Sequence, residues 1–390
     1  MAFWNTIVEF FQQSGIAGFF VDGGWRNLIM IVLALILLFL AIKKDFEPYL
    51  LLPISFGMLL INLPYAGQEL FVTIKDEAGN ITGYSGLLGY LYYGVKLGIY
   101  PCLIFLCIGA TTDFGPLISN KKTMLLGAAA QIGIFITFIG AILLNFTPQE
   151  ASAIGIIGGA DGPTAILVTT NLAPHLLSSI SIAAYSYMAL VPVIQPPIIK
   201  LLTTKKERLI RMDSNVKPVS KRERIMFPII VTIVVILLVP SCAPLIGCLM
   251  LGNLIKESGV VPNITHTLSN GLLYTVTILL GICVGATATA ENFLTIQTIE
   301  IFALGIFAFA TATAGGVAFG KLMCIATKGK VNPMIGAAGV SAVPMAARVV
   351  HKVGQDEDPE NFLLMHAMGP NVAGVIGSAV AAGVLLLLFK

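Results

Sequence analysis

The sequence predicts an all-α polytopic membrane protein made of two inverted-topology repeats, each with a broken re-entrant segment. Three observations support this fold class: the composition, the recurrence of long apolar runs, and glycine-rich motifs that occur in both halves. Hydrophobic residues make up 56% of the 390 residues and charged residues only 11%, and the mean hydropathy is +0.90. A soluble globular protein has roughly 25% charged residues. This chain therefore has too few charges to cover a water-facing surface.

Apolar runs long enough to cross a bilayer recur along the whole chain. A helix needs about 20 apolar residues to span the hydrocarbon core. The segment Met1–Gly24 lacks the basic start and cleavage site of a secretory signal, and Met1–Phe20 is either a first span or an interfacial helix. The predicted membrane segments are Asn27–Ile42, Tyr49–Leu63, Lys96–Thr112, Thr123–Phe146, Leu176–Leu202, Ile225–Ile255, Gly271–Ala290, Ile299–Met323 and Phe362–Phe389.

A basic linker between Lys200 and Arg224 divides the chain into two membrane halves. Loops rich in lysine and arginine face the cytoplasm, so we expect this linker on the cytoplasmic side of a bacterial inner membrane. It lacks interleaved aromatic residues and lies between two spans, which argues against nucleic-acid binding. The predicted organisation is N-terminal helices and an external loop (1–95), a first repeat (96–203), the linker (204–224) and a second half (225–390).

The cysteines and histidines form no pattern typical of a metal site. All six cysteines lie inside apolar runs without a CxxC pair, so we expect buried free thiols. The four histidines are scattered near segment ends, where capping or interfacial roles are expected. The sequence therefore predicts no transition-metal site.

Two motifs recur in the two halves at nearly one offset. The offsets are 176 positions for the first motif and 178 for the second. A two-residue insertion before Glu291 reconciles them and places Glu291 opposite Asp113. The matched segments are Ile108-Gly-Ala-Thr111 with Val284-Gly-Ala-Thr287, and Ile157-Gly-Gly-Ala160 with Ile335-Gly-Ala-Ala338.

The distribution of basic residues predicts that the repeats are inverted. If Ala151–Thr170 crossed the membrane completely, the basic linker after Leu202 would lie outside, against the positive-inside rule. We therefore expect the re-entrant segment 151–170 to enter from the outside and fold back. The same count of membrane crossings in the second half predicts that 331–350 is a re-entrant segment that enters from the cytoplasmic side. Paired broken segments of this kind place ion sites near the midplane of many secondary transporters.

The strongest local signal is the stretch from Gly155 to Thr164, with Asp161 inside it. Four glycines and a proline in ten residues interrupt any helix. Broken backbone at membrane depth exposes carbonyl oxygens that suit an alkali cation, and an ionisable side chain there indicates function. The structural alternative is that Asp161 only caps a half-helix beginning at Gly162.

The stretch from Lys330 to Arg348 is the counterpart in the second half. It combines glycines and prolines with the oxygen donors Asn332 and Ser341. Arg348 suits an anionic ligand through its guanidinium group, and the alternative is a cytoplasmic anchor.

Other polar residues at the edges of membrane segments have two interpretations each. Asp113 and Glu291, with Asn292, are candidate pathway residues or helix-end residues. Tyr187 is a proton carrier or an ordinary core tyrosine, and Asn371 is a pathway residue or a cap.

Several long motifs resemble the beta subunit of sodium-transporting, biotin-dependent decarboxylases. That family acts on oxaloacetate, methylmalonyl-CoA, malonyl-CoA or glutaconyl-CoA, and the resemblance covers essentially the whole chain. The motifs are Gly158-Gly-Ala-Asp-Gly-Pro-Thr164, Gly252-Asn-Leu-Ile-Lys-Glu-Ser-Gly259, Val331-Asn-Pro333, Pro344-Met-Ala-Ala-Arg348 and Phe362-Leu-Leu-Met-His-Ala-Met-Gly-Pro-Asn371.

The resemblance implies that the chain decarboxylates carboxybiotin and exports sodium, consuming an external proton. It implies catalytic roles for Asp161, Tyr187 and Arg348, and it implies sodium binding by Asp161, Asn332, Gly336 and Ser341.

The resemblance also implies partners: a carboxyltransferase alpha subunit, a biotin carrier subunit, a small membrane-anchor subunit and a homotrimeric core. The cofactors are Na+ and biotin, the latter as carboxybiotin on a partner, because the chain has no Met-Lys-Met attachment motif. Inverted repeats alone fit an alternative equally well, a sodium-coupled secondary transporter without decarboxylase activity.

Overall fold

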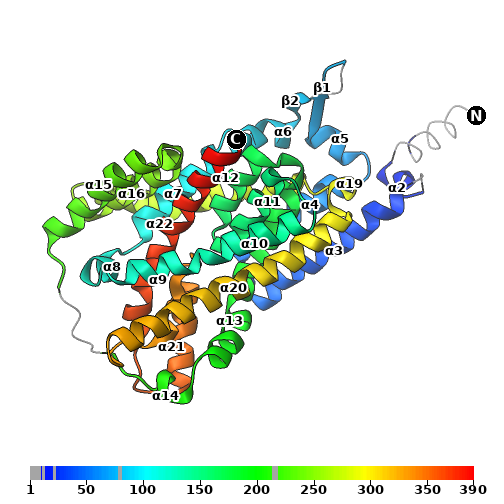
Figure 1. Ribbon diagram of the computed structural model, residues 1–390. Coiled ribbons are helices and arrows are strands. Elements are labelled where there is room, and N and C mark those ends of the chain that lie inside the picture. The colour runs from blue at the N-terminus through cyan, green and yellow to red at the C-terminus, as the bar shows by residue number, and fades with distance from the viewer. Residues whose placement is uncertain (1–9, 11–13, 21–22, 78–80, 213–217) are drawn as a thin grey trace, which may run out of the picture.

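The protein is a bundle of long helices with a small strand pair at one end (Figure 1). The computed structural model describes residues 10, 14–20, 23–77, 81–212 and 218–390. Among these, six helices are long and apolar enough to cross a membrane, or seven if a bent pair, Leu87–Lys96 with Ile99–Thr111, is one span. The two helices of that pair meet at 63°. The chain is therefore a multi-pass helical membrane protein, as predicted.

The first half starts with a helical hairpin and a short polar insertion. The predicted polar loop forms two antiparallel strands, a small departure from an all-α fold. The N-terminal segment lies mostly outside the described residues, so its membrane placement stays a prediction. The elements are α2 (Gly15–Gly18), α3 (Gly24–Lys44), α4 (Pro48–Asn62), α5 (Ala66–Leu70), β1 (Val72–Lys75), β2 (Ile81–Ser85), α6 (Leu87–Lys96) and α7 (Ile99–Thr111).

The rest of the first half contains the first broken segment, in which short helices replace one long span. The elements are α8 (Gly115–Ser119), α9 (Thr123–Ala130), α10 (Ile132–Leu143), α11 (Pro148–Gly155), the 3-10 helix η1 (Ile156–Gly159), α12 (Gly162–Leu172), η2 (Pro174–Leu176), α13 (Leu177–Leu202) and α14 (Lys205–Arg208).

The second half starts with a hairpin where the sequence predicted one apolar run. The run Ile225–Ile255 is divided at η3 (Pro240–Cys242) into α15 (Lys221–Leu238) and α16 (Ala243–Ser258). A single helix of that length would measure about 45 Å at 1.5 Å per residue, well beyond the roughly 30 Å hydrocarbon core. Arg224 at the start of α15 lies 3.7 Å from Glu257 at the end of α16, so the two helices fold back on each other. The apolar run predicted as one membrane segment is therefore two helices.

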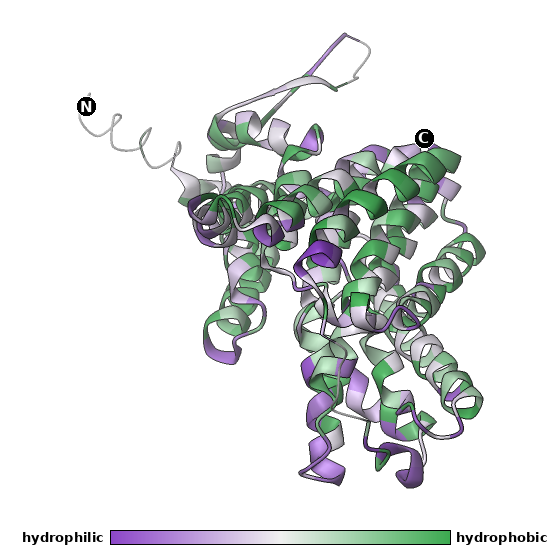
Figure 2. Cartoon of the chain, turned by 90° about the vertical axis from the view of Figure 1, so that its left-hand side faces the viewer, coloured by the Kyte–Doolittle hydropathy of each residue, from purple (hydrophilic) through white to green (hydrophobic). Residues whose placement is uncertain are grey.

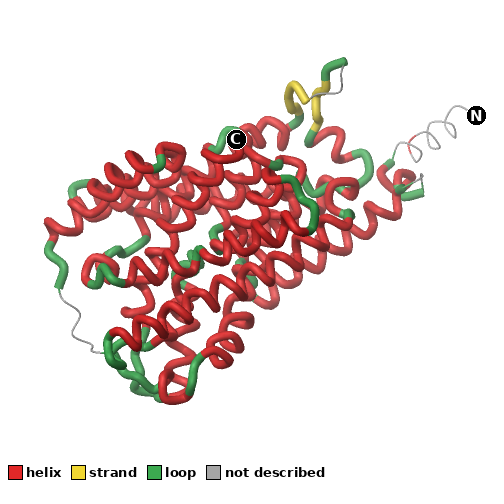
Figure 3. The backbone as a smooth tube through the Cα atoms, in the orientation of Figure 1, coloured by secondary structure: helices red, strands yellow, loops and turns green. Residues whose placement is uncertain are grey.

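The remaining elements contain the second broken segment, between α20 and α22. Non-helical backbone lies in the interior of the bundle as well as at its ends (Figure 3). The elements are α17 (Pro262–Thr267), the π-helical turn η4 (Leu268–Leu272), α18 (Leu273–Ala286), α19 (Ala290–Phe293), α20 (Ile296–Ala326), η5 (Pro333–Gly339), α21 (Met345–Glu357) and α22 (Leu364–Phe389).

The helix flanks are mainly hydrophobic, and hydrophilic residues gather near the ends of the bundle (Figure 2). Many large apolar side chains on these flanks are exposed, among them Val32 at 48%, Phe39 at 55% and Leu237 at 78%. Lipid tails solvate such side chains as well as a protein core does. The exposed apolar surface is therefore the lipid-facing surface of the protein.

Candidate functional site

The first broken segment presents Asp161 from the N-terminus of α12. The 3-10 helix η1 ends at Gly159; the next residue, Ala160, has a φ of 57°, and Asp161 is extended. The backbone N–H of Thr164 donates to Asp161 Oδ1 at 3.4 Å, so the carboxylate caps α12. A Cβ on Gly162 would lie 2.1 Å from the Tyr185 ring, which explains the glycine after Asp161. The predicted interruption of the helix is confirmed, and Asp161 does cap the half-helix.

The two ends of the first broken segment lie close together. Glu150 forms a capping box with Thr147 at the start of α11. His175, which follows α12, has its Nε2 only 2.8 Å from Glu150 Oε1. The chain therefore returns at 175 to the place where it entered at 148.

The second broken segment is held at its start and buried along its length. Asn332 Oδ1 accepts from the backbone N–H of Met334 at 3.0 Å and so caps η5. Its Nδ2 donates to the carbonyls of Arg208 at 3.2 Å and Ile210 at 2.9 Å. Gly336 lies against α20, where a Cβ would come within 2.0 Å of the Gly316 carbonyl oxygen.

The interior parts of the two broken segments meet next to Asp161. The backbone N–H of Ser341 donates to the Gly159 carbonyl at 3.0 Å. From α22, Ser378 Oγ donates to Asp161 Oδ2 at 2.8 Å. Asn371, one of the predicted pathway residues, donates from Nδ2 to the carbonyls of Ala338 at 3.0 Å and Val340 at 2.7 Å. The structure thus brings Asp161, Ser341 and Asn371 into one region, although they come from distant parts of the chain.

Among the described residues, several buried oxygens in this region have no hydrogen-bond partner. They are Thr164 Oγ1, Ser341 Oγ, Asn371 Oδ1 and Gln131 Oε1. Buried polar atoms normally have partners, and an unpaired oxygen is a ready ligand for a cation. Asp161 is only 6% exposed, and a buried carboxylate needs a compensating charge or proton. The arrangement therefore suits a small hard cation.

Three residues of this region were missed by sequence reasoning: Gln131, Tyr185 and Ser378. Gln131 Nε2 donates to the Gly127 and Gly374 carbonyls, and its Oε1 lies 3.6 Å from a Cβ built on Gly159. Gln131 was detectable as an amide inside an apolar run. Ser378 was not, because a serine in a small-residue helix is common in membrane proteins.

Neither Tyr187 nor Arg348 is among the hydrogen-bond partners of the Asp161 carboxylate, which are Thr164 and Ser378. The Tyr187 hydroxyl donates to the Phe302 carbonyl on α20, and the tyrosine against the Asp161 turn is Tyr185. Arg348 is exposed on α21. Neither residue has a preformed contact with Asp161. Their predicted roles therefore require the substrate to come close to them.

Asp113, Glu291 and Asn292 lie at helix ends. Asp113 Oδ1 accepts from the Gly115 N–H at 2.8 Å and lies 3.6 Å from Arg224 Nη1. Asn292 donates through its backbone N–H to Thr289 Oγ1 at 3.4 Å. These contacts favour the helix-end interpretation for Asp113 and Asn292.

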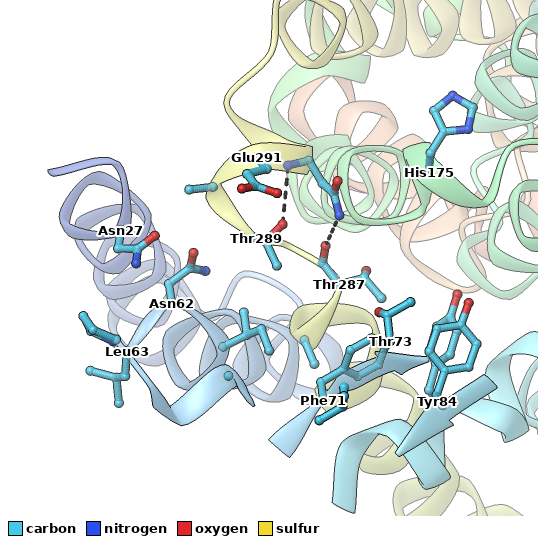
Figure 4. Close-up of a pocket in the computed structure, with 18 of the residues that line it drawn as sticks. Asn27, Asn62, Leu63, Phe71, Thr73, Tyr84, His175, Thr287, Thr289 and Glu291 are labelled. Carbon is cyan, nitrogen blue, oxygen red and sulfur yellow. Dashed lines mark hydrogen bonds between the residues drawn. The ribbon is translucent and has the colours of Figure 1, made fainter. Parts of the chain in front are cut away.

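Glu291 and Asn292 line an open cavity of about 950 Å³ beside the strand pair. Figure 4 shows Glu291, Thr287 and Thr289 facing Asn62 and Phe71 across it, with His175 and Tyr84 at its sides. None of the residues that contact the Asp161 carboxylate lines this cavity. The hydrogen bonds around Asp161 therefore indicate the position of the functional site more directly than the size of this cavity does.

Comparison with known proteins decides the family. The family model of the Na+-transporting oxaloacetate decarboxylase beta subunit matches residues 26–389. The chain belongs to this family. It is the beta subunit of a Na+-transporting biotin-dependent decarboxylase, as the sequence motifs predicted.

Curated relatives cover nearly the whole chain. The methylmalonyl-CoA decarboxylase subunit beta of Propionigenium modestum is 58% identical, over 99% of each chain. The glutaconyl-CoA decarboxylase subunit beta of Acidaminococcus fermentans is 55% identical, over 99% of this chain and 98% of its own. The oxaloacetate decarboxylase beta chain of Klebsiella pneumoniae is 51% identical, over 93% of this chain and 95% of its own. These relatives act on different substrates, and the name beta implies a multisubunit complex.

Proposed function

We propose that this beta subunit decarboxylates carboxybiotin and exports sodium at the junction of the two broken segments, consuming a proton from outside. One observation carries the proposal: a buried carboxylate, Asp161, lies where both broken segments meet, among oxygens that have no protein donor. Sodium and a proton compete for such a carboxylate. A site that exchanges one for the other can couple a proton-consuming reaction to ion export.

The chemistry balances with one proton. The bond between the carboxylate carbon and the ureido nitrogen of biotin breaks, CO₂ leaves, and the nitrogen takes up a proton. Moving one charge against 100 mV costs about 2.3 kcal/mol. A decarboxylation can drive a step of this size if both events share one site, and Asp161 is the residue that we propose links them.

The sodium ligands that we propose are Asp161 and Ser341, with Asn332 and Gly336 as supports. Ser341 Oγ is buried without a donor beside the Gly159 contact. Both polar ends of the Asn332 amide are occupied by backbone hydrogen bonds, which favours a supporting role. Gly336 supports the site by allowing η5 to lie against α20. Ser378 and Asn371 act on the same site through their contacts with Asp161 and Val340.

Carboxybiotin arrives, in this proposal, from the cytoplasm near Arg348. An exposed guanidinium suits a carboxylate delivered by a partner subunit. Tyr187 serves as the proton carrier between α13 and α20. The partners are a carboxyltransferase alpha subunit, a biotin carrier and a small membrane-anchor subunit, around a homotrimeric beta core in the bacterial inner membrane.

We infer that the fold consists of two inverted repeats with re-entrant broken segments. The adjacency of Glu150 and His175 supports a segment that enters and leaves on one face. Asn253 on α16 donates to the Thr112 carbonyl after α7, and Asn62 on α4 donates to the Ala288 carbonyl after α18. Thr112 and Ala288 are 176 positions apart, the offset of the first sequence motif. The hairpin α3–α4 therefore corresponds to α15–α16, and we extend the first repeat to include it.

The experiment that tests this function is sodium-dependent decarboxylation of free carboxybiotin by the purified chain. We expect sodium to stimulate CO₂ release, and we expect the chain to copurify with a biotinylated protein from its native membrane. A sodium-coupled secondary transporter would do neither. Transport of sodium without any effect of carboxybiotin would therefore favour that alternative.

A further inference from the structure

A short segment after α13 crosses the cytoplasmic end of the second half. We call residues 203–212 the strap. Thr204 and Glu207 form a capping box that starts α14. Glu207 lies 3.4 Å from Lys321 Nζ on α20, and Met212 packs against the main hydrophobic core. The strap is therefore an ordered part of the fold.

Arg208 is the one strap residue whose charged side chain is largely buried between two other elements. Its Nε donates to Glu357 Oε1 at 2.7 Å, at the end of α21. Its Nη1 donates to the Thr203 carbonyl, at the end of α13. The Arg208 side chain is 13% exposed and that of Glu357 is 16% exposed. A pair buried to this degree is costly to break, because the remaining charge loses its partner.

The backbone of the strap holds both ends of the second broken segment. The Arg208 carbonyl accepts from Asn332 Nδ2 at 3.2 Å and from Asn361 Nδ2 at 2.9 Å. Asn332 precedes η5, and Asn361 follows α21. The Ile210 carbonyl accepts a further bond from Asn332 at 2.9 Å. One residue, Arg208, thus contacts the start of the segment, its end, and the end of α13.

We propose that Arg208 is a positioning residue for the coupled reaction: it fixes the base of the second broken segment so that Ser341 stays against Gly159 beside Asp161. The inference rests on the function proposed above. The interior contact is a single backbone hydrogen bond, from Ser341 N to Gly159 O at 3.0 Å. A shift at the base moves Ser341 relative to the carboxylate, and ion ligands must keep precise geometry. Arg208 acts through Ser341 and touches neither sodium nor carboxybiotin.

Arg211, in the same strap, provides a matched control. It also pairs with acidic residues after α21: Asp358 at 2.7 Å and Glu360 at 2.7 Å. Hydrogen bonds from Arg211 hold the pKa of Asp358 below its ordinary value. The Arg211 side chain is 56% exposed, and surface ion pairs contribute little. Arg211 and Arg208 therefore share chemistry and neighbourhood but differ in burial and in their link to Asn332.

The test compares R208K with R211K in the full complex. A lysine at 208 has a single ammonium group, which cannot reproduce the forked geometry that joins Glu357 to Thr203. We expect the sodium concentration for half-maximal decarboxylation to rise about tenfold in R208K, within the usual range of coupling between sites. We expect kcat at saturating sodium and the KM for the biotin carrier to stay close to the wild-type values. R211K should behave as wild type in all three.

A second variant, Asn361→Ala, removes one bond to the Arg208 carbonyl without changing a charge, and it should shift the sodium dependence in the same direction by less. It decides the matter if R208K does not fold. The inference is overturned if R208K and R211K show the same sodium dependence. If R208K does not fold, the same comparison is made between Asn361→Ala and R211K. A drop in thermal stability and kcat without a sodium shift also overturns it, because that pattern indicates a structural role only. If the wild-type complex showed no sodium-stimulated decarboxylation, the proposed function itself would be overturned, and the inference with it.

Discussion

At the residue scale, Asp161 carries the first prediction. Asp161→Asn removes the charge that we propose exchanges sodium for a proton, so both sodium transport and carboxybiotin decarboxylation should be lost. Asp161→Glu keeps a carboxylate with displaced geometry and should keep part of the activity. Sodium uptake into inside-out vesicles and CO₂ release measure the two functions.

The control for this prediction is Asp113→Asn. Asp113 accepts from the Gly115 N–H at a helix end, and an asparagine oxygen can accept the same bond. Full sodium-stimulated decarboxylation in Asp161→Asn would remove Asp161 from the coupling step.

Ser341 and Arg348 carry the second prediction, a division of labour. Among the described residues, Ser341 Oγ is buried without a hydrogen-bond partner and the Ser341 N–H donates to the Gly159 carbonyl, whereas Arg348 is exposed on α21. Ser341→Ala should raise the sodium requirement severalfold and leave the KM for the biotin carrier nearly unchanged. Arg348→Ala should raise that KM with little change in the sodium requirement. Steady-state kinetics at varied sodium and varied carrier separate the two, and identical effects would refute the division.

The same scale shows what a sequence can predict about a site. Asp161 could be singled out from the sequence because an ionisable side chain in a membrane segment is unusual, and Ser341 because it lies in the matching glycine- and proline-rich break. Ser378 could not be, because its importance comes from a hydrogen bond to Asp161, 217 residues away. Tyr187 was expected near the chemistry, but α13 directs Tyr185 toward the Asp161 turn instead. Contacts between residues far apart in the sequence, and the rotation of each helix about its axis, decide which side chains reach Asp161.

At the element scale, α7 and α16 are in close backbone contact at two glycines, one on each helix. A Cβ on Gly109 would lie 1.9 Å from the Leu249 carbonyl oxygen, and one on Gly252 would lie 1.9 Å from the Leu106 carbonyl oxygen. The helices run parallel. One turn back from Leu106 and Gly252 lie Cys102 and Cys248, which the same register places opposite each other.

This register gives the third prediction. With the other cysteines replaced by serine or alanine, a mild thiol oxidant should convert Cys102 and Cys248 to a disulfide, because parallel helices this close bring the two Cα atoms within bridging distance. Two free thiols per chain should disappear, as counted by mass spectrometry after alkylation. A chain retaining only Cys107 and Cys248 is the control, since Cys107 packs toward Ala110 and Leu268.

The cross-linked protein should keep its sodium-dependent activity. Backbones in such close contact cannot slide without separating, so this helix pair is a fixed part of the fold. A disulfide that forms and abolishes activity would show instead that α7 and α16 move during the cycle.

Element boundaries illustrate why some of the fold was not predictable. The apolar run Ile225–Ile255 has no charge at its centre, and Pro240, Ser241 and Pro244 mark the turn. A proline alone is a weak signal in membrane proteins: α13 continues through Pro192, Pro196 and Pro197. What decides between a kink and a turn is packing against neighbouring helices. Here α15 and α16 pack on each other, and Arg224 and Glu257 close the hairpin.

At the scale of the whole molecule, ion pairs and hydrogen bonds mark two opposite ends. The strap and the chain after α21 pair through Arg208 with Glu357 and Arg211 with Asp358. At the opposite end of the bundle (Figure 1), Lys390 Nζ donates to Asn171 Oδ1 at 2.9 Å, close to the end of α12. The positive-inside rule assigns the strap to the cytoplasm, so the end of α12 and the C-terminus should lie outside.

The last prediction tests this topology with single cysteines in a Cys-free background. Thr82, on the strand pair, and Gln149, at the start of α11, should react with an impermeant maleimide only from outside. Lys206, in the strap, and Glu360, after α21, should react only from the cytoplasm; all four residues are exposed. Ser214 would extend the series, but it lies outside the described residues.

The informative pair is Gln149 and Lys206. If residues 148–172 formed a complete span, α13 would return the chain to the outer face, and Gln149 and Lys206 would label from the same side. If the segment folds back, as the 2.8 Å contact between Glu150 and His175 supports, the two positions label from opposite sides. Labelling from the same side would therefore rule out the re-entrant segment, and with it the inverted repeat.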